Sequence, residues 1–403
     1  MQKKLIALAV AGLASTAAFA QTNVTIYGLV DYGYAYRWDG RDAGTVFNNA
    51  GVPIARTSGT PNSQSQLNGG QSLGNRLGFK GTEDLGNGLK AVFLLEQGFM
   101  LDTGNQQTAG SQFTRQAYMG LSGNFGTVVG GRLYTPHYTF VSGLDPFGAG
   151  TVGRYNNVYS SAAFASYGNG GTLGDPVRVD NAVAYISPSF LGGLTATLAF
   201  SNNAGGQEDA SSNAANNTVY AGLLKYDNGP ISAGLNYHYI NGGSRLSDAT
   251  LASPIGVKNA ENATLGGSYD FKVVKVMALY SWNQVDYLIN PALVSNTGRT
   301  ATINNYMLGA TAPFGKFVGK ASYIYSDGNT RAGGDAQQFA LGLDYNLSKR
   351  TAIYSAYSFI DNSDNRMSAV GDASNSGAYA AGNGYNLPGV FQQGIQFGVR
   401  HMF

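Results

Sequence analysis

Apolar and polar residues alternate along most of this chain with a period of two. In ISAGLNYHY, residues 231–239, the apolar side chains fall at odd positions, while Ser232 and Asn236 fall at even ones. Segments 194–201 and 336–346 show the same alternation. Because successive side chains of a β-strand point to opposite faces, each segment is expected to form a strand with one apolar and one polar face.

Counting such segments predicts sixteen strands. They lie near 22–37, 73–81, 89–101, 113–122, 127–133, 178–188, 193–202, 217–227, 230–240, 261–270, 273–287, 303–312, 316–327, 336–346, 350–361 and 391–403. Short connections such as DNGP and APFGK alternate with long ones, among them residues 38–72 and 134–177. Strands of roughly ten residues in even number, with short turns at one end and long loops at the other, are typical of outer-membrane barrels.

A soluble β-sandwich is the alternative fold, since its strands alternate as well. Its apolar faces would pack into a core, and its long loops would not all lie at one end. A closed barrel pairs every backbone group within lipid, and at sixteen strands it encloses an aqueous channel. The pattern therefore predicts an all-β protein, a 16-stranded antiparallel transmembrane β-barrel with short periplasmic turns and long extracellular loops.

The first twenty residues, MQKKLIALAVAGLASTAAFA, have the pattern of an export signal. Lys3 and Lys4 precede an apolar stretch, and small residues ending at Ala20 form a cleavage site. No later apolar run reaches the roughly eighteen residues that a transmembrane helix needs. We therefore expect cleavage after Ala20, with the barrel occupying residues 21–403.

Charge and cysteine content exclude several classes of protein. Without the two lysines of the signal, 23 of the 25 basic residues remain, which equals the 23 acidic residues. A nucleic-acid-binding protein would show a basic excess, so no nucleic-acid partner is expected. The chain has no cysteine for disulfides or thiolate metal sites and only three histidines. We expect no cofactor and no metal site built from cysteine or histidine, while divalent ions bound by loop carboxylates stay open.

The stretch from Arg132 to Asn157, RLYTPHYTFVSGLDPFGAGTVGRYNN, lacks both the alternation of a strand and the spacing of a helix. Pro136 and Pro146 are expected to interrupt either element. Structureless loops of this length are uncommon in compact domains and usually have a function.

Two enzymatic interpretations of this loop carry little weight. Its three glycines in GAGTVG match G-x-G-x-x-G, but a dinucleotide site needs a buried strand before the motif and a helix after it. His137, Ser142 and Asp145 suggest a hydrolytic triad, yet triads are recognised by geometry and not by spacing within one loop. We therefore predict that the protein is not an enzyme.

Several segments resemble the general-diffusion porins of Gram-negative bacteria, most closely the neisserial and burkholderial type. They are VTIYGLVDYGYAY, NRLGFKGTEDLGNGLKAVFLLE, FTRQAYMGLSGNFGTVVGGR and FGVRHMF. The resemblance implies a homotrimer in the outer membrane, surrounded by lipid and lipopolysaccharide, that passes small hydrophilic solutes by passive diffusion. It also implies that the third long loop, about 134–177, folds into the lumen, and that Phe403 is a signal to the barrel-assembly machinery.

Charged residues on the strands indicate what lines the channel. Arg76 and Lys80 alternate with apolar residues, as do Glu96, Arg178 and Asp180. A basic side chain that faces lipid at mid-depth costs roughly 2–4 kcal/mol, so these side chains should face the lumen.

Three further candidates depend on the resemblance or on position. The alternation does not decide whether Arg115 faces the lumen or the lipid, but the resemblance places a constriction arginine there. Arg132 is a candidate because it ends the fifth strand. Asp145 in DPFG resembles the acid of the family's Pro-Glu-Phe-Gly loop tip, although it precedes the proline. The candidate constriction and selectivity residues are Arg76, Lys80, Glu96, Arg115, Arg132, Asp145, Arg178 and Asp180. Their small positive excess predicts weak anion selectivity.

Other functions remain open at this point. They are a substrate-specific outer-membrane channel for a sugar or an organic anion and, in a different class, a surface adhesin. Sugar channels stack their substrates on aromatic side chains, whereas barrels carry aromatic girdles at the membrane interfaces. Strand tyrosines such as Tyr237 lie on the apolar face, as expected for a girdle. Tyr134, Tyr138 and Phe147 lie in the loop, so the alternation does not decide whether they contact solutes.

Overall fold

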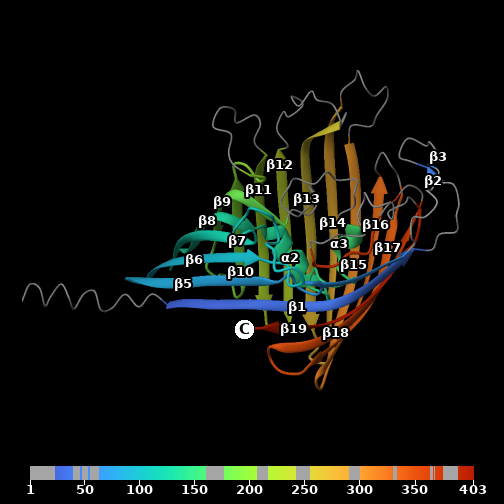
Figure 1. Cartoon of the computed structure of the whole chain (residues 1–403). Coiled ribbons are helices and arrows are strands. Elements are labelled where there is room, and N and C mark those ends of the chain that lie inside the picture. The colour runs from blue at the N-terminus through green and yellow to red at the C-terminus, as the bar shows by residue number, and fades with distance from the viewer. Residues whose placement is uncertain are drawn as a thin grey trace, which may run out of the picture.

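The computed structural model shows one antiparallel sheet that curves into a barrel (Figure 1). The structure describes residues 23–39, 46–47, 53–54, 63–159, 177–206, 217–241, 255–289, 300–329, 334–363, 366, 368–374 and 389–403. The expected signal segment 1–20 and residues 160–176 of the third loop lie outside the described residues.

Strands make up most of the described chain. They are β1 (Asn23–Asp39), β2 (Val46–Phe47), β3 (Pro53–Ile54), β4 (Ser63–Gly69), β5 (Arg76–Gly86), β6 (Leu89–Gly98), β7 (Gln116–Gly123), β8 (Gly126–Tyr134), β9 (Arg178–Ile186), β10 (Leu194–Ser201), β11 (Thr218–Asn228), β12 (Ile231–Asn241), β13 (Ile255–Asp270), β14 (Lys275–Ile289), β15 (Thr300–Phe314), β16 (Phe317–Asn329), β17 (Ala336–Asn346), β18 (Thr351–Asn362) and β19 (Gln392–Met402). The helices are α2 (Pro136–Leu144) and α3 (Asn156–Tyr159). Neither of these described helices has the length and apolar character needed to cross a bilayer.

Hydrogen bonding between the first and last strands closes the sheet. β1 pairs with β19 on one side, and on the other side with β4 and β5. β4 and β5 pair with successive parts of β1, so they form a single barrel strand that is interrupted between residues 70 and 75. β2 and β3 pair with each other in a separate two-stranded sheet, so the described barrel sheet has sixteen strands, which confirms the predicted 16-stranded antiparallel barrel.

The two faces of the wall match the alternation in the sequence. In β12, Leu235 is 52% exposed on the outer face, whereas the neighbouring Asn236 is fully buried on the inner face. His238, also inward, lies against His137 of the third loop, with 5.1 Å between ring centres. Outward side chains are apolar because they meet lipid, and inward ones are polar because they meet water or the loop.

The described part of the third long loop contains two helices, where the sequence indicated none. Pro136 occupies the first turn of α2, and the side chain of Thr135 caps the helix by accepting the N–H of Tyr138 at 3.1 Å. A proline in the first turn lacks only an N–H that has no helical partner there. The interpretation of Pro136 as a helix breaker is therefore wrong, since proline breaks a helix only in its interior.

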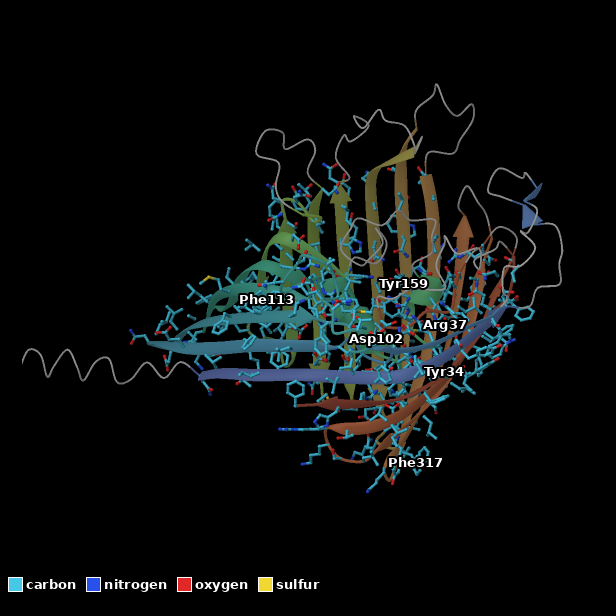
Figure 2. The ribbon with its side chains drawn as sticks, viewed as in Figure 1. Tyr34, Arg37, Asp102, Phe113, Tyr159 and Phe317 are labelled. Atoms are coloured by element: carbon cyan, nitrogen blue, oxygen red, sulfur yellow. The ribbon has the colours of Figure 1, made fainter. Side chains whose placement is uncertain are left out.

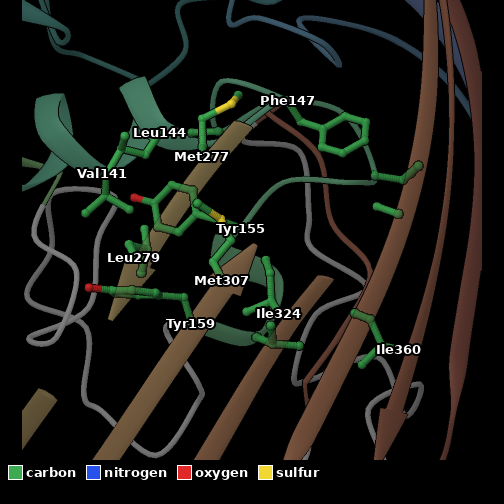
Figure 3. Close-up of a cluster of buried hydrophobic side chains, with 14 of the residues drawn as sticks. Val141, Leu144, Phe147, Tyr155, Tyr159, Met277, Leu279, Met307, Ile324 and Ile360 are labelled. Carbon is green, nitrogen blue, oxygen red and sulfur yellow. The ribbon is translucent and has the colours of Figure 1, made fainter. Parts of the chain in front are cut away.

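The hydrophobic core lies between this loop and the inner wall. Figure 3 shows Val141, Phe147 and Tyr155 of the loop beside Met277 of β14 and Ile324 of β16. All five side chains are nearly inaccessible to solvent. The described part of the loop between β8 and β9, residues 135–159, thus runs inside the barrel, packed against one side of its wall.

Phe403 lies at the seam of the barrel, where the first strand β1 pairs with the last strand β19. Its backbone exchanges hydrogen bonds of 3.0 and 3.1 Å with Gly28 of β1, and its ring covers Gly28 so closely that a Cβ there would lie 2.2 Å from the ring. These contacts extend the pairing of β19 with β1.

We predict that deleting Phe403 lowers the yield of folded, heat-modifiable protein in the outer membrane, because two seam hydrogen bonds and the ring cover are lost together. Phe403→Ala keeps the backbone bonds and should show a smaller loss. The yield is measured by comparing heated and unheated membrane samples on gels. Equal yields from the deletion variant and the wild type would contradict a role for Phe403 at the seam.

Candidate constriction site

Two arginines, one just before β7 and one at the start of β9, meet around the hydroxyl of Tyr134. Arg115 donates from Nη2 to Tyr134 Oη at 2.7 Å, and Arg178 donates to the same oxygen at 2.9 Å. The Arg178 guanidinium also lies 4.7 Å from the centre of the Tyr134 ring, within the range of a cation–π contact. Tyr134 therefore holds two positive side chains close together at the end of β8.

One carboxylate, Glu96, belongs to this group. Arg115 donates from Nε to Glu96 Oε1 at 2.8 Å, and the hydroxyl of Tyr27 donates to Glu96 Oε2, also at 2.8 Å. Arg76 interacts electrostatically with both Arg115 and Glu96. With one carboxylate among three guanidinium groups, the cluster keeps a net positive charge.

The arginines line a hollow of about 80 Å³ between the wall and the third loop. Its lining comprises Leu73, Gly74, Arg76, Gln107, Arg115, Tyr138, Gly148, Ala149, Arg154, Asn156, Val177, Arg178 and Ala373. Four of these residues are arginines and, of the described residues that line the hollow, none is acidic. The site thus presents concentrated positive charge where the loop approaches the wall.

The structure brings together Arg76, Glu96, Arg115 and Arg178 of the residues predicted from the sequence. Lys80 lies next to this group, with Nζ 5.3 Å from the centre of the Tyr27 ring, and it is exposed. It does not line the hollow.

Arg132 and Asp180 do not line this hollow, and their predicted place at the constriction stays a prediction. They form an ion pair with each other, and Arg132 also donates from Nε to the Thr114 carbonyl at 2.7 Å. The pairing of β8 with β9 shifts register between Gly131 and Leu133. A β-bulge breaks the alternation of faces, so counting positions through it does not place Asp180.

The prediction for Asp145 also needs correction. Only 5% of this residue is exposed, and its carboxylate accepts backbone N–H groups from Phe147 at 3.0 Å, Ala149 at 2.9 Å and Tyr155 at 3.1 Å. Asp145 follows the end of α2 and fixes the path of the loop beyond it. Its charge organises the loop and does not line the hollow.

Other charged residues, not among the predicted ones, lie on the inside of the barrel. Arg154 lines the hollow, but it lies in the aperiodic loop, where no alternation could assign it. Asp344 binds Arg400 at 2.6 Å and Lys320 at 2.9 Å. Arg400 stands on the polar face of the alternating segment 391–403, so the signal for that residue was present in the sequence.

The part of the loop after Asp145 is anchored to distant segments. The N–H of Thr151 donates to the Gln71 carbonyl at 2.9 Å, and the N–H of Val152 donates to Gln396 Oε1 at 2.8 Å. Arg37 of β1, labelled in Figure 2, forms a fully buried ion pair with Asp372, whose backbone carbonyl accepts from Arg154. These bonds hold the loop at a fixed distance from the wall.

A closed sixteen-stranded barrel, with an apolar outer face and an internal loop that narrows it, defines an outer-membrane diffusion channel. The chain belongs to the Gram-negative porin family, whose model matches residues 7–365. It is therefore a porin of the bacterial outer membrane, through which small solutes pass by passive diffusion.

Individual proteins support the family assignment. Outer membrane porin protein 32 of Delftia acidovorans is 35% identical over 407 residues, which cover 100% of both chains. An outer membrane porin protein of Bordetella pertussis is 32% identical, covering 92% of this chain and 98% of that protein. The solved structure of an anion-selective porin from Comamonas acidovorans matches with a TM-score of 0.73 at 31% identity, covering 95% of this chain and 100% of that one.

Proposed function

We propose that this porin is an anion-preferring diffusion channel without catalytic activity, whose selectivity is set by Arg76, Arg115, Arg154 and Arg178. The observation that carries the proposal is the hollow at the loop, which four arginines and no acidic residue of the described chain line. The similar Comamonas acidovorans porin is described as anion-selective, which supports the same preference here.

Selectivity follows from charge at the narrow part of the channel. Rings of basic side chains favour anions. Charges that are partly removed from water are screened by salt less than surface charges are. Glu96 offsets part of the positive charge through Arg115, so the preference is expected to be weak to moderate.

The assembly belongs to the same proposal. Residues 1–20 are removed on export, and three copies form a trimer whose outer faces meet lipid and lipopolysaccharide. Phe403 engages the barrel-assembly machinery before it closes the seam with Gly28. The resemblance of the sequence to general-diffusion porins supports these steps, and the seam contacts of Phe403 support the last of them.

We expect the double variant Arg76→Gln with Arg178→Gln to move the reversal potential in a potassium chloride gradient towards cations. Two of the four guanidinium charges at the hollow are then lost, so the dependence of selectivity on ionic strength should also weaken. The measurement uses planar bilayers, with liposome swelling in neutral sugars to show that the aperture is unchanged.

A matched control removes two positive charges elsewhere. Lys316→Gln with Lys349→Gln neutralises two exposed lysines of short turns, outside the hollow, and should leave the reversal potential near that of the wild type. A wild-type channel that prefers potassium to chloride would overturn the proposal. So would an arginine variant that behaves like the lysine control.

A further inference from the structure

Tyr138 of α2 presents an aromatic ring to the arginine-lined hollow. It is partly buried against the core of the loop and lines the same hollow as the four arginines. Its ring stacks on that of Tyr134, with 5.0 Å between the ring centres and 23° between the planes. A general anion filter needs the arginines but has no need of a ring beside them.

The position of this ring is fixed before any solute arrives. The N–H of Tyr138 donates to Thr135 Oγ1 at the start of α2, and its stacking partner Tyr134 is held by hydrogen bonds from Arg115 and Arg178. A solute that packs against a rigid ring loses less binding free energy to the ordering of the protein. The hollow therefore combines a preformed aromatic surface with positive charge.

The surrounding chemistry selects the kind of solute. Arginine forks bind carboxylates through paired hydrogen bonds, and guanidinium planes also stack on aromatic faces. A neutral sugar would gain from the ring but not from four positive charges. A small inorganic anion would gain from the charges but not from the ring. A planar aromatic ring that bears a carboxylate is complementary to both.

We propose that the constriction is a subsite for aromatic carboxylates, in which the solute ring packs against Tyr138 and its carboxylate binds the surrounding arginines. This subsite rests on the proposed anion preference and names the solute class that the same site takes. The hollow of about 80 Å³ has room for several water molecules, which the solute displaces as it passes. Aromatic pairs of this kind prefer offset or edge-to-face packing.

The test compares two acids of equal charge and similar size, benzoate and cyclohexanecarboxylate, as blockers of the chloride current through single channels of the full-length porin. Only benzoate has a planar π-system, so it should block the wild-type channel at concentrations about two- to tenfold lower. In Tyr138→Leu this ratio should fall to about one, and in Tyr138→Phe, which keeps the ring, it should be retained. Tyr237→Leu, which removes an outward-facing tyrosine, should leave the ratio as in the wild type.

Because both acids are compared in the same channel, the ratio of their blocking concentrations corrects for any change in channel number or aperture. Equal block of the wild type by both acids, or a ratio that survives in Tyr138→Leu, would overturn the subsite. Those results would leave the preference for chloride over potassium intact, so they are distinguishable from a failure of the proposed function. A potassium-preferring wild-type channel would remove both proposals together.

Discussion

Replacing Gly150 with alanine is expected to displace the third loop from the wall and widen the channel. A Cβ at this position would lie 1.6 Å from the carbonyl oxygen of Ser72, which belongs to the backbone and cannot rotate away. The neighbouring bond from Thr151 to the Gln71 carbonyl would be lost as the loop moves. Overpacking of this kind typically costs about 1–3 kcal/mol.

Single-channel conductance and liposome swelling with sugars of increasing size measure the change. Gly150→Ala should raise both the conductance and the size limit. Gly143→Ala is the matched control, since a Cβ there meets nothing within 4 Å and alanine suits the helix better than glycine. If both variants conduct like the wild type, the loop does not depend on its contact with Ser72.

The free energy of unfolding should decrease as the pH rises from about 4 to about 6, because of Asp145. Burial raises the pKa of this loop carboxyl to about 6, even though three backbone N–H groups favour its ionised form. In the unfolded chain the pKa returns to its ordinary value of 3.8. Between these values the folded protein holds a proton that the unfolded chain has released, so rising pH favours unfolding by up to about 3 kcal/mol.

Urea unfolding of the purified porin, followed at a series of pH values, checks this expectation. Asp145→Asn cannot titrate and should remove this part of the pH dependence, whatever it costs in overall stability. Asp102→Asn, in an exposed turn, should keep the slope of the wild type. Parallel pH profiles for the wild type and Asp145→Asn would show that Asp145 is ionised throughout this range.

The barrel wall was predictable because each strand meets the same two environments along its length. Outward positions contact lipid and inward ones contact water or the loop, so a period of two appears in the sequence without knowledge of distant residues. The predicted segments 230–240 and 336–346 correspond to β12 and β17 within one residue. Strand β4 was missed, because the sequence analysis placed its residues 63–69 in the long connection 38–72.

The constriction was predictable only in part. Arg76, Glu96 and Arg178 lie in the cluster where their strands predicted them, and Arg115 joins it through Glu96 and Tyr134 although the alternation left it open. Asp180, the ion-pair partner of Arg132, falls at a bulge of β9, where counting positions fails. Asp145 was assigned by similarity to a loop motif, and its three backbone partners show a different role.

By itself, the sequence determined the barrel, the number of its strands, and which face of each strand points inward, towards water or the loop. A periodic pattern records a local environment that repeats, and that information is present in every strand. Only the tertiary structure decided that Tyr138 and Arg154 of the loop face Arg76 and Arg178 of the wall across one hollow. The loop residues follow no period, because their positions depend on contacts with strands that are distant in the sequence, such as the bond from Val152 to Gln396, 244 residues away.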